Sequence, residues 1–206
     1  MERVQVYYAC IVGIQYTLLM KSPFSFIVSP INDRRYNNIK KIGDVDFITS
    51  TSEEDHKSSN RFATVKATPI NYEGEIQVGD TLVVHHNVFK FYNDMYGRRQ
   101  SGRSYFRDDL FIVDNDQFFL YKKDGVWRGH DKYCFVKPSE KKESFIEKGG
   151  SIEPLVGVIK YINKELEDLG LQVGDEIAYQ PDSEYEFIID DEVLYRMYTS
   201  HITLKL

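Results

Sequence analysis

A segment near the C-terminus occurs a second time in the middle of the chain. Leu171–Tyr179 reads LQVGDEIAY, and Ile76–Val84 reads IQVGDTLVV. The two Val-Gly-Asp triplets are 95 positions apart, counted from Gly79 to Gly174. An internal repeat of this kind indicates two copies of one supersecondary unit. The 206 residues are therefore expected to form two similar modules.

Each copy has the pattern of a small β unit. Val-Gly-Asp supplies a turn, because glycine tolerates positive φ and aspartate bonds the nearby backbone. An apolar strand and a hairpin follow, and then come Phe111–Leu120 in one copy and Tyr185–Arg196 in the other, both rich in aromatic and β-branched residues. No helical periodicity fits these segments. The sequence therefore predicts an all-β fold.

The repeat extends upstream of the Val-Gly-Asp turn. Ala63–Lys66 matches Gly157–Lys160 at an offset of 94. Phe26–Pro30 matches Phe135–Pro138 at an offset of 108 between the two prolines. The first copy is thus expected to carry about 14 extra residues (108 minus 94) between its first two strands, a length that a loop tolerates.

The repeat also extends downstream, where the pattern aligns Phe111 with Phe187 at an offset of 76. The hairpin of the first copy is then longer by about 19 residues (95 minus 76), again as an insertion between strands. Lys132–Pro138, at the junction, fits two positions: the last strand of the first copy and the first strand of the second. Both assignments are kept open.

The second copy resembles the C-terminal half of the GroES-type co-chaperonins. The matching residues are Gln172–Asp175, Ile189–Leu194 and Ser200–Ile202, in the family's order and at similar spacing. This resemblance implies two tandem GroES-like small β-barrel modules with long mobile loops, in a tandem variant of the kind a bacteriophage encodes. It also implies a homo-oligomeric ring. If the junction strand is shared, two ring positions are fused without a flexible linker.

The expected domain boundaries follow from the repeat. Residues 1–19 are apolar and tyrosine-rich and precede every repeated element, so we expect a non-structural N-terminal extension with Met20 as the functional start. A signal peptide is the alternative. Module one is expected at 20–138 and module two at 132–206. Module one has an enlarged loop at 31–61 and an enlarged hairpin at 87–107, and module two has a loop at 139–154.

Each long loop contains a short apolar island in a polar segment. In the first loop the island comprises Val45, Phe47 and Ile48, followed by Thr49, and in the second it is Phe145-Ile146. The polar composition predicts loops that pack no core and remain mobile. The resemblance implies that these islands bind a GroEL-type chaperonin. The alternative is that each island packs against its own module.

The enlarged hairpin at 87–107 combines arginines and tyrosines, namely Tyr96, Arg98, Arg99, Arg103 and Tyr105. The resemblance implies that it forms the roof of the ring. A segment of this composition can also stack on single-stranded nucleic acid and neutralise its phosphates. The formal net charge of −6 disfavours broad attraction to nucleic acid or to an anionic membrane, so neither is expected as a partner.

Motifs for catalysis are missing from the sequence. It contains no phosphate-binding glycine loop, no G-x-S-x-G, no C-x-x-C and no H-E-x-x-H. His85 and His86 are adjacent in an expected strand, which would place them on opposite faces and prevent joint chelation. Cys10 and Cys134 are the only cysteines, and a disulfide framework is not expected in a reducing cytoplasm. We expect no enzyme, no metal and no cofactor.

Together these expectations describe a co-chaperonin that caps a chaperonin chamber in the cytoplasm, which for a viral protein is the host's. Its elaborated tandem form suggests a client such as a viral capsid protein. The alternative is a virion structural or decoration protein that reuses the GroES-like fold. The apolar islands distinguish the two, because a purely structural part has no need of them.

Overall fold

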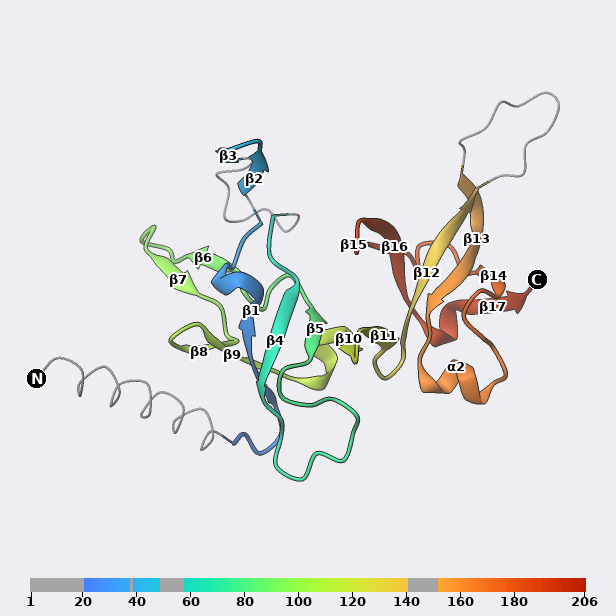
Figure 1. Cartoon of the computed structure of the whole chain (residues 1–206), viewed down its shortest axis with the longest axis horizontal. Coiled ribbons are helices and arrows are strands. Elements are labelled where there is room, and N and C mark those ends of the chain that lie inside the picture. Colours follow the sequence, from blue (N-terminus) through green and yellow to red (C-terminus); the bar gives the residue numbers. More distant parts are fainter. Residues whose placement is uncertain (1–20, 38, 49–57, 141–151) are drawn as a thin grey trace, which may run out of the picture. The chain divides into compact units, whose positions relative to one another are not determined.

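The computed structural model describes residues 21–37, 39–48, 58–140 and 152–206. Those residues form antiparallel sheets and one short α-helix, α2 (Lys164–Asp168), so the all-β prediction is confirmed. The chain divides into two compact units, Met1–Phe118 and Phe119–Leu206 (Figure 1). The expected extension at 1–19 lies outside the described residues, and so does most of the loop expected at 139–154.

The first unit is built on one antiparallel sheet, whose strands follow the order β5-β4-β1-β9-β8. Hairpins β2–β3 and β6–β7 form two small separate sheets. Two short 3-10 helices, η1 and η2, follow β1 and β9. The elements are β1 (Phe26–Pro30), η1 (Ile31–Asp33), β2 (Ile39–Ile42), β3 (Val45–Ile48), β4 (Phe62–Ala67), β5 (Thr81–Val84), β6 (Phe91–Asn93), β7 (Arg99–Ser101), β8 (Tyr105–Arg107), β9 (Leu110–Val113) and η2 (Asn115–Gln117).

The second unit contains a six-stranded antiparallel sheet in the order β15-β16-β12-β13-β14-β17. Before it in sequence, β10 pairs with β11. The strand order is open at β15 and β17 in the described residues. The elements are β10 (Phe118–Lys123), β11 (Val126–Gly129), β12 (Tyr133–Glu140), β13 (Ile152–Tyr161), α2, β14 (Glu176–Tyr179), β15 (Tyr185–Ile189), β16 (Glu192–Tyr198), the 3-10 helix η3 (Thr199–His201) and β17 (Ile202–Lys205).

The first two strands of the repeat, β1 and β4 in the first unit and β12 and β13 in the second, pair in the same register. Val28 lies opposite Val65 in the first unit, and Val136 lies opposite Ile159 in the second. In both pairs the register shifts just before this valine. Val28 and Val136 are 108 positions apart, and Val65 and Ile159 are 94 positions apart. These are the offsets that the sequence predicts between the two copies. Lys132–Pro138 therefore contributes the first strand of the second unit, which pairs with β13 and β16.

The Val-Gly-Asp turn has the same construction in both units. Gly79 has φ of 100° and Gly174 has φ of 95°, a conformation in which a side chain would be strained. In each turn the aspartate carboxylate accepts a hydrogen bond of 2.8 Å from the amide of the glutamine three residues earlier. The glycine amide donates at 2.9 Å to the preceding strand. The turn thereby fixes where β5 and β14 begin.

The downstream half of the predicted alignment is wrong. Phe111 lies opposite Val28, whereas the residue opposite Val136 is Tyr195. Phe111 is therefore equivalent to Tyr195, at an offset of 84, and not to Phe187. The error arises because β9 and β15 both carry a Phe-Ile pair before an aspartate, while the strand that pairs with the first strand of the second unit is β16.

Two aspartates form the hairpin turn that precedes the equivalent strands. Asp108 and Asp109 connect β8 to β9 with φ of 46° and 58°, and Asp190 and Asp191 connect β15 to β16 with φ of 49° and 63°. A two-residue hairpin turn with both φ positive suits Asp and Asn better than other side-chain-bearing residues. Strands β8 and β15, which precede these turns, are thus structurally equivalent.

In both copies of the repeat a 3-10 helix follows, η2 in the first unit and η3 in the second, and the next strand in sequence begins directly after it. The amide of His85 donates to the carbonyl of Gln117 at 2.7 Å, and the amide of Gln180 donates to that of His201 at 2.9 Å. These two bonds occupy equivalent places at the end of the strand that follows the Val-Gly-Asp turn. The repeat therefore includes both ends of the unit.

Helix α2 lies outside the repeated segments and is not predicted by them. Asn163 begins it, and its side chain accepts a hydrogen bond of 3.1 Å from the amide of Leu166. Gly170, with φ of 85°, follows its end. Such residues are preferred at the N-cap and just beyond the C-terminus of a helix. The helix is short, and its one buried residue, Leu166, anchors it to the core.

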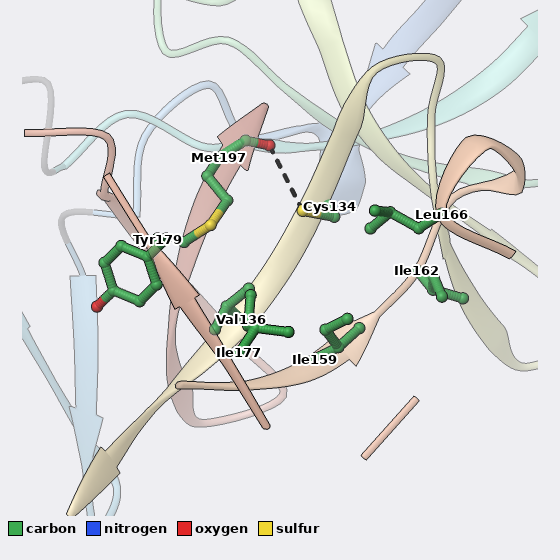
Figure 2. Close-up of a cluster of buried hydrophobic side chains, with 8 residues drawn as sticks. All are labelled: Cys134, Val136, Ile159, Ile162, Leu166, Ile177, Tyr179 and Met197. Atoms are coloured by element: carbon green, nitrogen blue, oxygen red, sulfur yellow. Dashed lines mark hydrogen bonds between the residues drawn. The ribbon is translucent and has the colours of Figure 1, made fainter. Parts of the chain in front are cut away.

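The core of the second unit joins α2 to four strands (Figure 2). Its buried members are Cys134, Val136, Ile159, Ile162, Leu166, Ile177, Tyr179 and Met197. The first unit has an aromatic core instead, in which Phe26 meets Phe118 edge-to-face at 5.3 Å and Phe89 meets Phe111 at 4.8 Å. Each unit thus has its own buried core, as expected for a module.

Candidate functional site

The apolar island of the first loop lies on a hairpin apart from the main sheet. Strands β2 and β3 pair with Ile42 opposite Val45, and a turn containing Gly43 with φ of 62° joins them. The exposed fractions are 58% for Val45, 49% for Phe47 and 68% for Ile48. The hairpin lies beyond the end of the sheet in Figure 1. These three side chains are therefore largely open to solvent, and their role in binding stays a prediction.

The remaining predicted loop residues cannot be placed in the same way. Thr49, Phe145 and Ile146 lie outside the described residues. Their role stays a prediction.

The two ends of the first loop are joined by a stem. The amide of Asn37 donates to the carbonyl of Ser58 at 2.8 Å, and the amide of Asn60 donates to that of Arg35 at 2.9 Å. The buried side chain of Asn60 donates to the carbonyls of Ile31 and Arg34 at 3.2 and 2.7 Å. Because buried polar groups are costly unless satisfied, these bonds fix the stem. The polar composition of the loop at 31–61 predicts that it packs against nothing. That prediction is wrong for the stem, where Asn60 is buried.

Arg35 attaches this stem to the enlarged hairpin. Its guanidinium lies over the rings of Phe91, Tyr105 and Phe111 at 4.1, 4.8 and 4.7 Å. Nη1 donates to Ser101 Oγ at 3.0 Å. The side chain is only 10% exposed, and burial lowers the pKa of Arg35. A planar guanidinium can stack on rings and donate in its plane at once, which lysine cannot do.

The carboxylate of Asp109 provides the charge partner of Arg35, with Nε and Oδ1 separated by 3.7 Å. This carboxylate raises the pKa of Arg35 and so opposes the effect of burial. Asp109 belongs to the two-aspartate turn before β9. The stem of the loop is thus held to the main sheet as well as to the hairpin.

Tyr36 makes a second attachment. Its hydroxyl accepts a hydrogen bond of 2.8 Å from the amide of Phe91, and the two rings stack with centroids 6.0 Å apart. Sequence reasoning missed both Arg35 and Tyr36. An Arg-Arg-Tyr run at the start of a polar loop was the one local signal, but it did not identify a partner.

The tip of the enlarged hairpin is organised by Asp94. Its carboxylate accepts hydrogen bonds of 2.9 Å from the amides of Tyr96 and Arg98 and one of 3.1 Å from Arg98 Nε. The bond from the Arg98 amide is the largest cause lowering the pKa of Asp94. The Arg98 guanidinium also lies 5.0 Å from the ring centre of Tyr96. These two predicted residues therefore meet at the turn.

The other predicted hairpin residues are distributed differently. Arg99 lies 3.7 Å from the ring centre of Phe91, and Tyr105 packs edge-to-face on Phe111 at 5.6 Å. Both therefore belong to the cluster around Arg35. Arg103 is exposed in the segment between β7 and β8. The predicted set is thus divided between the hairpin tip, the cluster around Arg35 and the exposed segment between β7 and β8.

The second unit has a comparable arginine at Arg196. Its guanidinium lies within 4.7 to 5.6 Å of four ring centres. These rings are Phe119, Tyr133, Tyr185 and Tyr198. An arginine surrounded by aromatic rings therefore occurs in both units, although Arg35 comes from a loop stem and Arg196 from β16.

The part of the chain that the structure describes holds no set of three His, Cys, Asp or Glu residues placed to bind a metal. The expectation that His85 and His86 face opposite sides is wrong, since their ring centres are 4.1 Å apart. They lie beyond the end of β5, where strand alternation no longer applies. Within the same residues, no helix has the length and apolar content to cross a bilayer.

Comparison with protein-family models and with curated proteins gave no match for this chain.

Proposed function

We propose that this protein is a ring-forming co-chaperonin that caps the chamber of a GroEL-type chaperonin. Each unit would then be a GroES-like β-barrel module. The proposal involves no cofactor and no enzymatic activity, and it places the protein in the cytoplasm, in a virus-infected host if the gene is viral. A capsid protein is the client that this tandem form suggests.

One observation carries the proposal, namely the exposure of Val45, Phe47 and Ile48 on a hairpin whose stem is fixed. An exposed apolar cluster on a loop whose two ends are joined by hydrogen bonds can enter an apolar groove of a partner. A virion structural protein has no comparable need for such a cluster. The register-matched repeat supports the proposal, because it lets one chain present two such modules.

The energetics favour binding by several loops together. Burying a Phe and an Ile contributes on the order of 1.5 to 3 kcal/mol each, while fixing each loop residue costs about 1 to 2 kcal/mol. A single loop should therefore bind weakly. A ring makes the later contacts intramolecular, and the resulting avidity can exceed the affinity of one loop by roughly 100-fold or more.

The test replaces Phe47 and Ile48 by serine and measures co-sedimentation with nucleotide-loaded GroEL-type chaperonin. We expect loss of binding with an unchanged oligomeric mass. Ile70→Ser is the matched control, because Ile70 is also an exposed aliphatic residue of the first unit but lies away from the loop. A double variant that binds as tightly as the parent would overturn the proposal.

A further inference from the structure

The two units present equivalent edge strands. Strand β8 ends the sheet of the first unit, and β15 ends the sheet of the second. Each directly precedes a two-aspartate turn and an equivalent strand, β9 paired with β1 or β16 paired with β12. An edge strand leaves backbone donors and acceptors available to another chain. The repeat thus places two comparable docking edges on one polypeptide.

These equivalent edges carry opposite charges. The ten residues from Arg98 to Arg107 include four arginines and no acidic residue, whereas the five from Asp182 to Glu186 include three acidic residues and no basic one. The chain as a whole has a net charge of −6. The basic edge is therefore a local exception on an acidic protein. It is complementary to the matching edge of the other unit.

Several charges on both edges are exposed to solvent. Arg98 is engaged by Asp94, Arg99 lies on Phe91, and the Arg107 guanidinium lies 5.1 Å from the ring centre of Phe106. Arg103 and Arg107 are both exposed and form no ion pair among the described residues. Glu184 and Glu186 are exposed likewise, and neither forms an ion pair within the same residues. Charges left in solvent by the fold of one chain can act between chains.

Apolar side chains accompany the charges on both edges. Tyr105 and Phe106 are exposed on β8. Glu184, just before β15, and Glu186 and Ile188 within it are exposed at alternate positions, and Ile188 lies opposite the exposed Val193 of β16. Arginine and aromatic residues without lysine are typical of the central part of protein interfaces, and no lysine occurs from Phe91 to Arg107.

We infer that the β8 edge of one chain docks on the β15 edge of a second copy. Arg103 and Arg107 meet the carboxylates of Glu184 and Glu186, while the exposed aromatic residues cover Ile188 and Val193. Because the two surfaces differ, the contact is head-to-tail, and it closes into a ring if the rotation between copies permits. The inference adds an interface to the ring of the proposed function. The interface between copies is measured in the absence of chaperonin. A failure of this inference can therefore be distinguished from a failure of the proposed chaperonin binding.

The test uses two charge-reversal variants, Arg103→Glu with Arg107→Glu and Glu184→Arg with Glu186→Arg. Native mass spectrometry and sedimentation of the full chain should show an oligomer for the parent. For each variant alone, the protein concentration below which the oligomer dissociates should be about 10-fold or more above that of the parent, because like charges then face one another. A mixture of the two variants should assemble again, since every contact in an alternating oligomer is complementary. Raising the salt from 0.15 to 1 M should weaken the parent oligomer.

Controls identify other origins of the effect. Lys66→Glu with Lys164→Glu changes the net charge by the same amount as Arg103→Glu with Arg107→Glu, lies outside both edge strands, and should leave the mass unchanged. A single chain carrying all four edge substitutions should assemble. If it does while the mixture does not, the contact lies within one chain and the inference is overturned. A monomeric parent, or reversal variants with unchanged mass, would also overturn it.

Single-stranded nucleic acid is the competing occupant of the basic edge. A fluorescent oligothymidine, measured by anisotropy, should show no binding to the assembled parent that depends on Arg103 and Arg107. Binding that is lost in Arg103→Glu with Arg107→Glu, while the oligomeric mass stays the same, would assign the edge to nucleic acid and overturn the inference.

Discussion

Trp127 donates a hydrogen bond from its indole Nε1 to the carboxylate Oδ2 of Asp190 at 2.8 Å. Trp127 is the only tryptophan of the chain and is buried on β11. Asp190 lies in the two-aspartate turn between β15 and β16, and Lys122 approaches the same oxygen at 3.7 Å. The hairpin β10–β11 is thereby tied to the second unit. Intrinsic fluorescence reports on that contact directly.

Replacing Asp190 by glycine should destabilise the second unit by about 1 to 3 kcal/mol, because the buried indole N–H loses its acceptor. Asp190→Asn retains an amide oxygen and should lose much less. Glycine keeps the positive φ available at this position, so turn strain does not confuse the comparison. Urea unfolding followed by tryptophan fluorescence measures the difference. Asp191→Gly serves as the control at the adjacent turn position, and an equal loss there would contradict the assignment.

Cys134 should be unreactive in the folded protein. It is fully buried, and burial raises the pKa of its thiol to about 12. A thiol with so high a pKa carries roughly 1,000-fold less thiolate at neutral pH than an ordinary exposed cysteine. With Cys10 replaced by serine, a maleimide should label the chain only as the second unit unfolds in urea. Stoichiometric labelling within minutes under native conditions, read by intact mass, would contradict this.

The stability of the second unit should fall in acid partly through Asp175. Its carboxylate accepts hydrogen bonds from Lys205 Nζ and from the amide of Gln172, and the bond from Lys205 is the largest cause lowering the pKa of Asp175. Because the folded pKa is depressed, the contribution is present above the unfolded value of about 3.9 and is lost as pH falls through the folded one. In Asp175→Asn, the urea concentration at the midpoint of unfolding should therefore fall less than in the parent as the pH is lowered from 5 to 2.

Lys205→Gln gives an independent check of that cause. It removes the lysine hydrogen bond but leaves the backbone one, so its pH profile should lie between those of the parent and Asp175→Asn. Identical acid profiles for all three proteins would show that Asp175 does not contribute.

The sequence was sufficient for features encoded by neighbouring residues. The Val-Gly-Asp turns were predictable because glycine and aspartate act within the turn itself. The N-cap Asn163 and the following Gly170 were equally local signals for α2, but α2 lies outside the repeated segments. The alignment of the two copies downstream of the Val-Gly-Asp turn could not be predicted from neighbouring residues. Phe111 and Phe187 share a local pattern, and only the partner strand distinguishes them.

The support of the candidate site was also hidden from the sequence. The serine that accepts a hydrogen bond from Arg35 lies 66 residues further along the chain, and the three rings around the guanidinium belong to β6, β8 and β9. Composition marked 31–61 as polar and therefore loose. A single arginine and the tyrosine after it reverse that expectation for the stem, because they bring their packing partners from elsewhere in the fold.

Arg35 should therefore control the rigidity of both the loop stem and the enlarged hairpin. Arg35→Lys retains a charge near Asp109 but loses the planar stacking on Phe91 and Tyr105, and Arg35→Met retains apolar length but loses the bond to Ser101 and the ion pair. Since neither replaces the full set of contacts, both should destabilise the first unit by about 1 to 3 kcal/mol. Hydrogen exchange measures where the loss occurs.

The decisive signal is the amide of Phe91, whose hydrogen bond goes to the Tyr36 hydroxyl. If Arg35 holds the stem against the hairpin, peptides covering 87–107 and 31–37 should exchange faster together in both variants, while peptides of the second unit keep the parent rates. Arg34→Lys, one residue earlier and exposed, is the matched control and should change neither segment. Faster exchange in the stem alone would show that the stem and the enlarged hairpin are independent. Arg35 would then not anchor the loop that carries the exposed island.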